Sequence, residues 1–147
     1  MLKDSFHIRL YQLRDETSVI KLWRICGLIV PWNNPYNDII RKLDIQPELF
    51  FVGLKDRVLI STVMGGYEGH RGWINYLAVH PDFQKRGYGS QILKEVEEEL
   101  KNKGCPKINL MIRKGNNKVI DFYQKLGYSV EDVTSMGKRI KDDHSKN

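Results

Sequence analysis

The sequence of 147 residues predicts a single α/β domain with a mixed sheet, spanning residues 1–147. Short apolar or alternating runs of strand length recur along the chain, and amphipathic runs with helix-capping residues separate several of them. A strand, a glycine loop and a helix follow one another directly over residues 73–100. With 41% hydrophobic and 29% charged residues, the composition is that of a globular protein with a real core.

The first two elements are a strand and a helix. Phe6, Ile8 and Leu10 alternate with polar residues, which predicts a strand with one buried face. The following helix is expected to begin at an Asp15 N-cap and to end at Gly27. Its apolar side chains repeat at helical spacing and are Val19, Leu22, Trp23 and Cys26.

A second helix is expected after a loop. Asn34 can cap it, Pro35 suits its first position and Pro47 should end it. We expect its apolar face to carry Ile39, Ile40 and Leu43.

Two strands, 50–54 and 58–67, should form a hairpin around residues 55–57. Gly65 and Gly66 predict a bulge in the second of these strands, or a place where another backbone comes close. The next strand, 73–79, leads through a basic glycine loop into a helix, and a parallel crossover should reach a strand at 108–112.

The last part of the chain begins with a further helix. Asn116 or Asn117 should cap it and Gly127 should close it. Short strands are expected at 128–133 and 136–140, followed by a polar tail at 141–147. The predicted order is β-α-α-β-β-β-α-β-α-β-β.

The glycine loop is the most informative motif. Residues 84–89 read Gln-Lys-Arg-Gly-Tyr-Gly, and such a loop before a helix presents backbone N–H groups to a phosphate. A dinucleotide fingerprint would need a third glycine at position 92, which is Ile92, and a Walker loop would need Gly-Lys-Ser/Thr. The loop resembles the pyrophosphate loop of the GNAT family of acetyl-CoA-dependent N-acetyltransferases. The segment from Asn116 to Tyr128 also resembles a GNAT segment.

The resemblance covers nearly the whole chain and implies a GNAT-type acyl-CoA N-acyltransferase fold. The whole chain is also similar to the YpeA-like bacterial subgroup, including a Pro-Trp-Asn-x-Pro loop at 31–35. It implies acetyl-CoA as co-substrate, no metal, and direct acetyl transfer to an amine. Tyr123 would protonate the departing thiolate, since a tyrosine still holds its proton near pH 7. The residues that would bind the cofactor are Leu77, Ala78, Val79, Gln84, Lys85, Arg86, Gly87, Tyr88, Gly89, Ser90 and Asn116.

The general base and the acceptor site are less defined by the sequence. Glu68 precedes the strand at 73–79 and is our first candidate for the base and for substrate contact. His70, Asn75 and Tyr76 are alternatives. By analogy with the family, Trp32 and Tyr36 would bind the acceptor, and Trp73 could wall the same pocket.

The amine acceptor is a small molecule or a peptide, and a protein N-terminus, a polyamine and a small metabolite all stay open. Two other readings remain: a coenzyme A-binding sensor without turnover, and a nucleic-acid-binding module using the net charge of +6. Nucleic acid is the weaker reading because the basic residues are scattered. No run approaches the ~20 apolar residues needed to span a bilayer. No signal-peptide core is seen, so a cytoplasmic protein without a membrane partner is expected, and a homodimer stays open as its oligomeric state.

Overall fold

The structure is a computed structural model that describes residues 5–143. The last four residues of the predicted polar tail, 144–147, lie outside the described residues. The strands are β1 (Phe6–Leu10), β2 (Phe50–Lys55), β3 (Val58–Tyr67), β4 (Gly72–Val79) and β5 (Ile108–Asn109). They form one mixed sheet in the order β1-β2-β3-β4-β5, in which only the β4–β5 pair is parallel.

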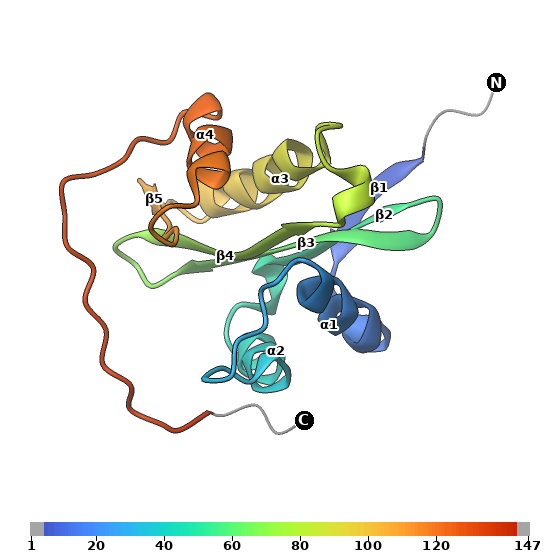
Figure 1. The fold of residues 1–147 in the computed structure, drawn as a ribbon, viewed down its shortest axis with the longest axis horizontal. Coiled ribbons are helices and arrows are strands. Elements are labelled where there is room, and N and C mark those ends of the chain that lie inside the picture. Colours follow the sequence, from blue (N-terminus) through green and yellow to red (C-terminus); the bar gives the residue numbers. More distant parts are fainter. Residues whose placement is uncertain (1–4, 144–147) are drawn as a thin grey trace. The chain divides into compact units, whose positions relative to one another are not determined.

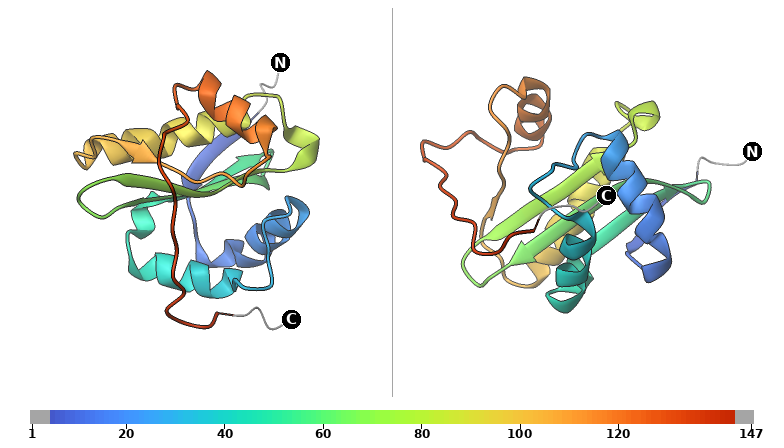
Figure 2. Two further views of the ribbon diagram at one scale, coloured as in Figure 1. Left: turned by 60° about the vertical axis from the view of Figure 1, so that its left-hand side comes forward. Right: turned by 60° about the horizontal axis from the view of Figure 1, so that its bottom comes forward.

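Helices cover both faces of this sheet. Helix α1 (Glu16–Ile25) and helix α2 (Pro35–Asp44) lie on one face, and α3 (Tyr88–Asn102) lies on the other, as Figure 1 and Figure 2 show. The mixed α/β fold expected from the sequence is confirmed. Among residues 5–143, no helix is long and apolar enough to cross a membrane.

The layer made by α1 and α2 closes over a core of large side chains. Trp23 and Phe50 are fully buried, and their rings stack with centroids 6.4 Å apart. The Asn34 cap is confirmed, because its side chain accepts hydrogen bonds from the N–H groups of Tyr36 and Asn37. Ile40 is 58% exposed, so its expected place on the apolar face is wrong. The buried side chain of this turn is Ile39.

Asp15 precedes α1 as predicted, but its carboxylate does not cap that helix. It accepts hydrogen bonds from Arg9 at 2.7 and 2.9 Å and from the Gln12 N–H at 2.8 Å. Burial works to raise the pKa of Asp15, but the bonds from Arg9 and Gln12 outweigh burial and leave the pKa below its usual value. The predicted cap is therefore wrong. Asp15 instead forms an ion pair with Arg9, which connects β1 to the start of α1.

The hairpin between β2 and β3 is confirmed. Lys55 pairs with Val58, so the turn consists of Asp56 and Arg57, which both have positive φ. Two successive residues of positive φ give the primed turn whose twist matches that of the flanking strands.

Gly65 and Gly66 do not form a bulge. The irregularities of register lie between Gly53 and Leu54 and between Thr62 and Met64. At Gly65 the close neighbour is instead a side chain of α3, since a Cβ there would come within 2.5 Å of Val96 Cγ2. Glycine at position 65 thus lets α3 pack directly on β3.

Residues 110–142 form a compact unit of their own. It contains α4 (Asn117–Lys125), which ends as predicted at Gly127, a residue of positive φ. The Tyr128 N–H then bonds to the Tyr123 carbonyl at 3.0 Å, which closes the helix.

The strands expected at 128–133 and 136–140 are wrong, because these residues carry no strand in the structure. The predicted strand at 108–112 is also shorter and ends at Asn109. Alternation of side chains gives a strand its two faces, but a neighbouring strand must accept its hydrogen bonds. Four apolar side chains of this segment are 73–94% exposed, namely Val130, Val133, Met136 and Ile140.

Candidate active site

A bulge in the middle of β4 shapes the site. Thr62 pairs with Ala78 and Met64 pairs with Asn75, so Val63 alone faces two residues, Tyr76 and Leu77. Tyr76 has a positive φ of 51°, which is strained for a bulky residue. Such bulges re-aim side chains and occur beside active sites.

Buried contacts hold this strained residue in place. The Tyr76 ring stacks on Trp23 with centroids 3.7 Å apart. The Thr62 hydroxyl donates to the Tyr76 carbonyl at 2.8 Å and accepts from the Trp23 indole N–H at 2.9 Å. Helix α1 and strand β3 together therefore fix the conformation of the bulge.

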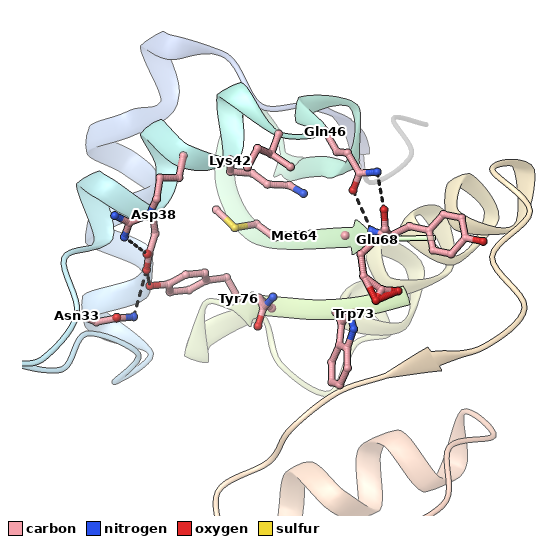
Figure 3. Close-up of a pocket in the computed structure, with 13 residues that line it drawn as sticks. Asn33, Asp38, Lys42, Gln46, Met64, Glu68, Trp73 and Tyr76 are labelled. Carbon is pink, nitrogen blue, oxygen red and sulfur yellow. Dashed lines mark hydrogen bonds and ion pairs between the residues drawn. The ribbon is translucent and has the colours of Figure 1, made fainter. Parts of the chain in front are cut away.

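A pocket of about 620 Å³ opens beside the bulge, between α2 and the β3–β4 hairpin (Figure 3). Successive strand residues normally point to opposite faces. Because of the bulge, both Asn75 and Tyr76 line this pocket, together with Trp73. The remaining lining residues are Asn33, Asp38, Arg41, Lys42, Ile45, Gln46, Met64, Gly66, Tyr67 and Glu68.

Asp38 is the centre of a hydrogen-bond network at one end of the pocket. Its carboxylate accepts from the Tyr76 hydroxyl at 2.6 Å and from the Asn33 amide at 3.1 Å (Figure 3). Arg41 donates to its other oxygen at 3.0 Å. Burial and the bond to Asp38 raise the pKa of Tyr76, so its hydroxyl stays protonated at neutral pH and serves as a donor.

Arg41 also binds the last described residue of the chain. Its guanidinium donates to Asp143 at 2.5 Å, and the Asn37 amide donates to the same carboxylate at 2.8 Å. These bonds lower the pKa of Asp143 to about 2. Asp143 belongs to the predicted polar tail, yet it is only 5% exposed.

Lys42 extends from α2 across β3, where its ammonium donates to the Gly65 carbonyl (Figure 3). Burial lowers the pKa of Lys42. A Cβ added to Gly66 would lie 4.0 Å from the Lys42 Nζ, which places this ammonium directly over the floor of the pocket.

Glu68, our candidate base, lines the pocket from the turn between β3 and β4. Its carboxylate accepts the N–H groups of Arg71 and His70, and these bonds lower the pKa of Glu68. Trp32 and Tyr36, the other predicted substrate contacts, are 48% and 43% exposed and do not line this pocket. The alternatives Asn75, Tyr76 and Trp73 do line it.

The predicted phosphate loop leads into the start of α3. Gly87 is the residue before the helix, with a φ of 86° and no side chain capping the helix. The first N–H groups of a helix need acceptors from elsewhere when no side chain supplies them. Lys85 and Arg86 are exposed beside this helix start.

The other predicted cofactor residues fall into three groups. Leu77 belongs to the bulge on β4, and Ala78 and Val79 follow it. The Gln84 amide ties the loop to this strand by donating to the Val79 carbonyl at 2.9 Å. The Tyr88 ring is buried against Phe6, so its backbone is the part left for a ligand. Gly89 and Ser90 continue the first turn of α3.

Tyr123 and Asn116 lie in the unit of residues 110–142. Tyr123 is the buried residue of α4, and its ring contacts Phe122 and Tyr128 edge-on at 5.2 and 5.3 Å. Asn116 precedes α4 but its side chain makes no capping bond, which leaves this exposed amide available to a ligand.

The pocket also contains residues of α2 that the sequence did not identify as functional. Asp38, Arg41 and Lys42 are spaced i, i+3 and i+4, so they share one helix face, and Ile45 follows the helix in an extended conformation. A charged face of this kind is indistinguishable in sequence from a solvated one. The apolar face of the same helix was the available signal. Because that face packs on the core, the charged face must point away from the core.

Comparison with known proteins agrees with this geometry. The model of the acetyltransferase (GNAT) family matches residues 9–128. The chain is 47% identical over 133 residues to a protein of Yersinia enterocolitica named an acetyltransferase, and the match covers 90% of this chain and 94% of that protein. A second acetyltransferase, from Pectobacterium atrosepticum, is 46% identical over 136 residues, covering 92% and 96%.

Solved structures show the same fold at lower identity. Ard1 from Thermoplasma volcanium superposes with a TM-score of 0.74 at 20% identity, over 86% of this chain and 84% of that one. The PaiA N-acetyltransferase from Thermoplasma acidophilum, solved in complex with coenzyme A, gives 0.69 at 21% identity, over 88% and 93%. With the family model covering most of the chain, this protein belongs to the acetyltransferase (GNAT) family.

Proposed function

We propose that this protein transfers the acetyl group of acetyl-CoA directly to a primary amine, without an acyl-enzyme intermediate. The observation that carries the proposal is the bulged strand β4. A pocket lies beside Asn75 and Tyr76 at the bulge, and the rest of the strand, through Val79, leads to the uncapped start of α3. One strand thus connects an acceptor pocket with a phosphate loop.

The residues of the loop fit the pyrophosphate of coenzyme A. The helix start at Gly87 has no side-chain cap, and the partial positive charge of a helix N-terminus favours an anion. Exposed Lys85 and Arg86 add positive charge beside it. Acetyl-CoA supplies an activated acetyl group, and one of the protein's relatives in fold holds coenzyme A.

The roles of the reacting residues follow from their chemistry. Tyr123 would donate a proton to the thiolate that leaves, since its ordinary pKa of about 10 lies above that of a thiol, about 8.5. Backbone N–H groups of Leu77–Val79 would hold the pantetheine arm and polarise the thioester carbonyl. For these roles, the chain of residues 1–147 would act as a single domain.

The acceptor enters at the pocket beside α2. Like any glutamate of ordinary or lowered pKa, Glu68 is ionised at neutral pH, and it would attract an ammonium group to the pocket rim. Deprotonating an α-amine of pKa about 8 costs only ~1.4 kcal/mol at pH 7, so a bound acceptor of this kind needs little help from a base.

The first test is a thermal melt with and without acetyl-CoA. At about 100 times Kd, binding should stabilise the protein by about 2.7 kcal/mol, which raises Tm by several degrees. Absence of any shift at saturating cofactor would reject the proposal and favour the nucleic-acid-binding alternative, which predicts binding with a steep salt dependence.

The second test separates catalysis from binding. Tyr123→Phe should lower kcat about 10²- to 10⁴-fold in an assay of thiol release with an amine panel, while leaving the thermal shift intact. Tyr128→Phe is the matched control, because Tyr128 contacts the Tyr123 ring. If the parent protein and both variants bind acetyl-CoA but none of them turns over, the sensor alternative is supported.

A further inference from the structure

Lys42 carries a positive charge whose partner is not a carboxylate. Its ammonium has three N–H donors, and over the described residues the only acceptor recorded for it is the Gly65 carbonyl. Glu48 acts on Lys42 through space, but Glu48 is itself paired with Lys103 at 2.9 Å. The pocket therefore contains a half-buried cation with unused donors.

Several other polar groups of the pocket already have hydrogen-bond partners within the protein. The carboxylate of Asp38 is shared among three donors, and Arg41 binds Asp38 and Asp143. The Gln46 amide donates to the Tyr67 carbonyl at 2.9 Å and accepts from the Tyr67 N–H at 2.8 Å. Of the two cations that line the pocket among the described residues, Arg41 is bound to carboxylates and Lys42 is bound to a carbonyl, so Lys42 is the one whose charge a ligand's anion can still complement.

We infer that the acceptor amine carries a carboxylate and that Lys42 binds this carboxylate. The inference rests on the proposed acetyl transfer and defines its acceptor class as amino acids or short peptides, in place of polyamines. A charge removed from water is stabilised mainly by an opposite charge and by hydrogen bonds, and the ligand's carboxylate supplies both to Lys42. The buried side chain of Met64 also lines the pocket, and an apolar neighbour of this kind strengthens an electrostatic contact.

Two side chains of opposite charge in the pocket suit a zwitterion. Glu68 on the β3–β4 turn is a carboxylate at the rim, and Lys42 is a cation over the floor. Burial lowers the pKa of Lys42 because it disfavours the charged form, and a carboxylate bound beside Lys42 would favour that form again. A polyamine would place a second ammonium near this lysine and would be repelled.

The experiment compares matched acceptors. We would measure kcat/KM for phenylalanine, phenylalaninamide, phenethylamine, glycylglycine, glycylglycinamide and spermidine. The amines differ in their own basicity, so the quantity to compare is how the ratio of carboxylate to carboxamide changes between variants. Lys42→Gln should reduce that ratio about 10- to 100-fold, which corresponds to loss of one charge-assisted hydrogen bond.

Three further variants keep the result interpretable. Lys42→Arg retains the charge and should preserve most of the preference. Gly66→Ala leaves the charge in place but puts a methyl group 4.0 Å from the Lys42 Nζ, so it should raise KM for carboxylate acceptors. Lys21→Gln removes an exposed charge of α1 and should leave the ratio unchanged.

Calorimetry gives a readout that does not depend on turnover. N-acetylphenylalanine should bind about 10-fold or more tightly than its carboxamide, and Lys42→Gln should abolish the difference. Equal affinities, or an unchanged preference in Lys42→Gln, would overturn the inference. Rapid acetylation of spermidine with no preference for carboxylates would also overturn it, while leaving the proposed function intact. Loss of both the acetyl-CoA shift and all turnover would reject the proposed function instead.

Discussion

Gly65 is the position where the packing of α3 on the sheet can be tested most directly. A Cβ at residue 65 would lie 2.5 Å from Val96 Cγ2, 3.6 Å from the Leu49 Cβ and 3.7 Å from Leu100 Cδ1. The first of these contacts is far shorter than van der Waals distance. Val96 and Leu49 are fully buried, and a valine has little rotamer freedom in a helix, so the clash cannot be relieved by one side chain turning away.

The expected cost of Gly65→Ala follows from this geometry. Adding a methyl group to a packed core destabilises a protein by about 1–3 kcal/mol. Gly65 has no positive φ, so backbone strain does not contribute. Replacing glycine by alanine also reduces the conformational freedom of the unfolded chain, which stabilises the folded protein by about 0.4–1 kcal/mol and offsets part of this cost. For a domain of this size, the gross penalty corresponds to a fall in Tm of roughly 2–12 °C.

The assay is a pair of thermal melts with Gly66→Ala as the matched control. The nearest atoms to a Cβ at residue 66 are the Gln46 Oε1 and the Lys42 Nζ, each 4.0 Å away, so this variant should melt at or slightly above the temperature of the parent. Equal melting temperatures for the two variants would refute the reasoning, because they would show that α3 can move away from β3 at no cost.

Three further predictions concern local interactions. Asn34→Ala removes the cap of α2 and should cost about 0.5–2 kcal/mol in denaturant melts, and Asn34→Asp, which can still cap, is the control. Asp15→Asn should destabilise the protein at neutral pH, and its deficit should shrink in acid. The reason is that the folded-state pKa of Asp15 is lowered, so its contribution is present above the unfolded pKa of about 3.9 and is lost as pH falls through the folded pKa. A deficit that is equal at pH 7 and pH 2 would contradict the ion pair with Arg9. The carboxyl of Asp143 should titrate with a pKa of about 2 by NMR, and Arg41→Gln should move it up toward the ordinary value; an unchanged titration would show that Arg41 does not bind it.

Local signals in the sequence were enough for much of the fold. The Asn34 cap, the hairpin around residues 55–57, and the closure of α4 at Gly127 each depend on a few neighbouring residues, and all are confirmed, with Lys55 joining the first strand of the hairpin. Interactions between distant residues were harder to predict. Asp15 looked like a helix cap because the ion pair with Arg9 depends on how β1 meets α1.

In the candidate site, too, residues marked by local signals were predicted and residues that depend on distant contacts were not. Glu68, Asn75 and Tyr76 were found because they border a recognisable strand. Lys42 was missed, since its importance depends on the burial of a helix face that reads as solvated. The strands expected at 128–140 failed for a related reason: alternation is local, but a strand requires a hydrogen-bonding partner, which the sequence does not specify.

The stacking of Trp23 on Tyr76 offers an optical reporter for the pocket. Trp23 is fully buried and lies 3.7 Å from the ring that lines the acceptor site, whereas Trp32 and Trp73 are 48% and 38% exposed. In a Trp32→Phe/Trp73→Phe double variant, the remaining indole would emit from an apolar, rigid environment next to the bulge. A ligand that displaces Tyr76 by even a small distance would then change its quenching, so occupancy of the pocket could be followed in real time by fluorescence, without a label and before any turnover.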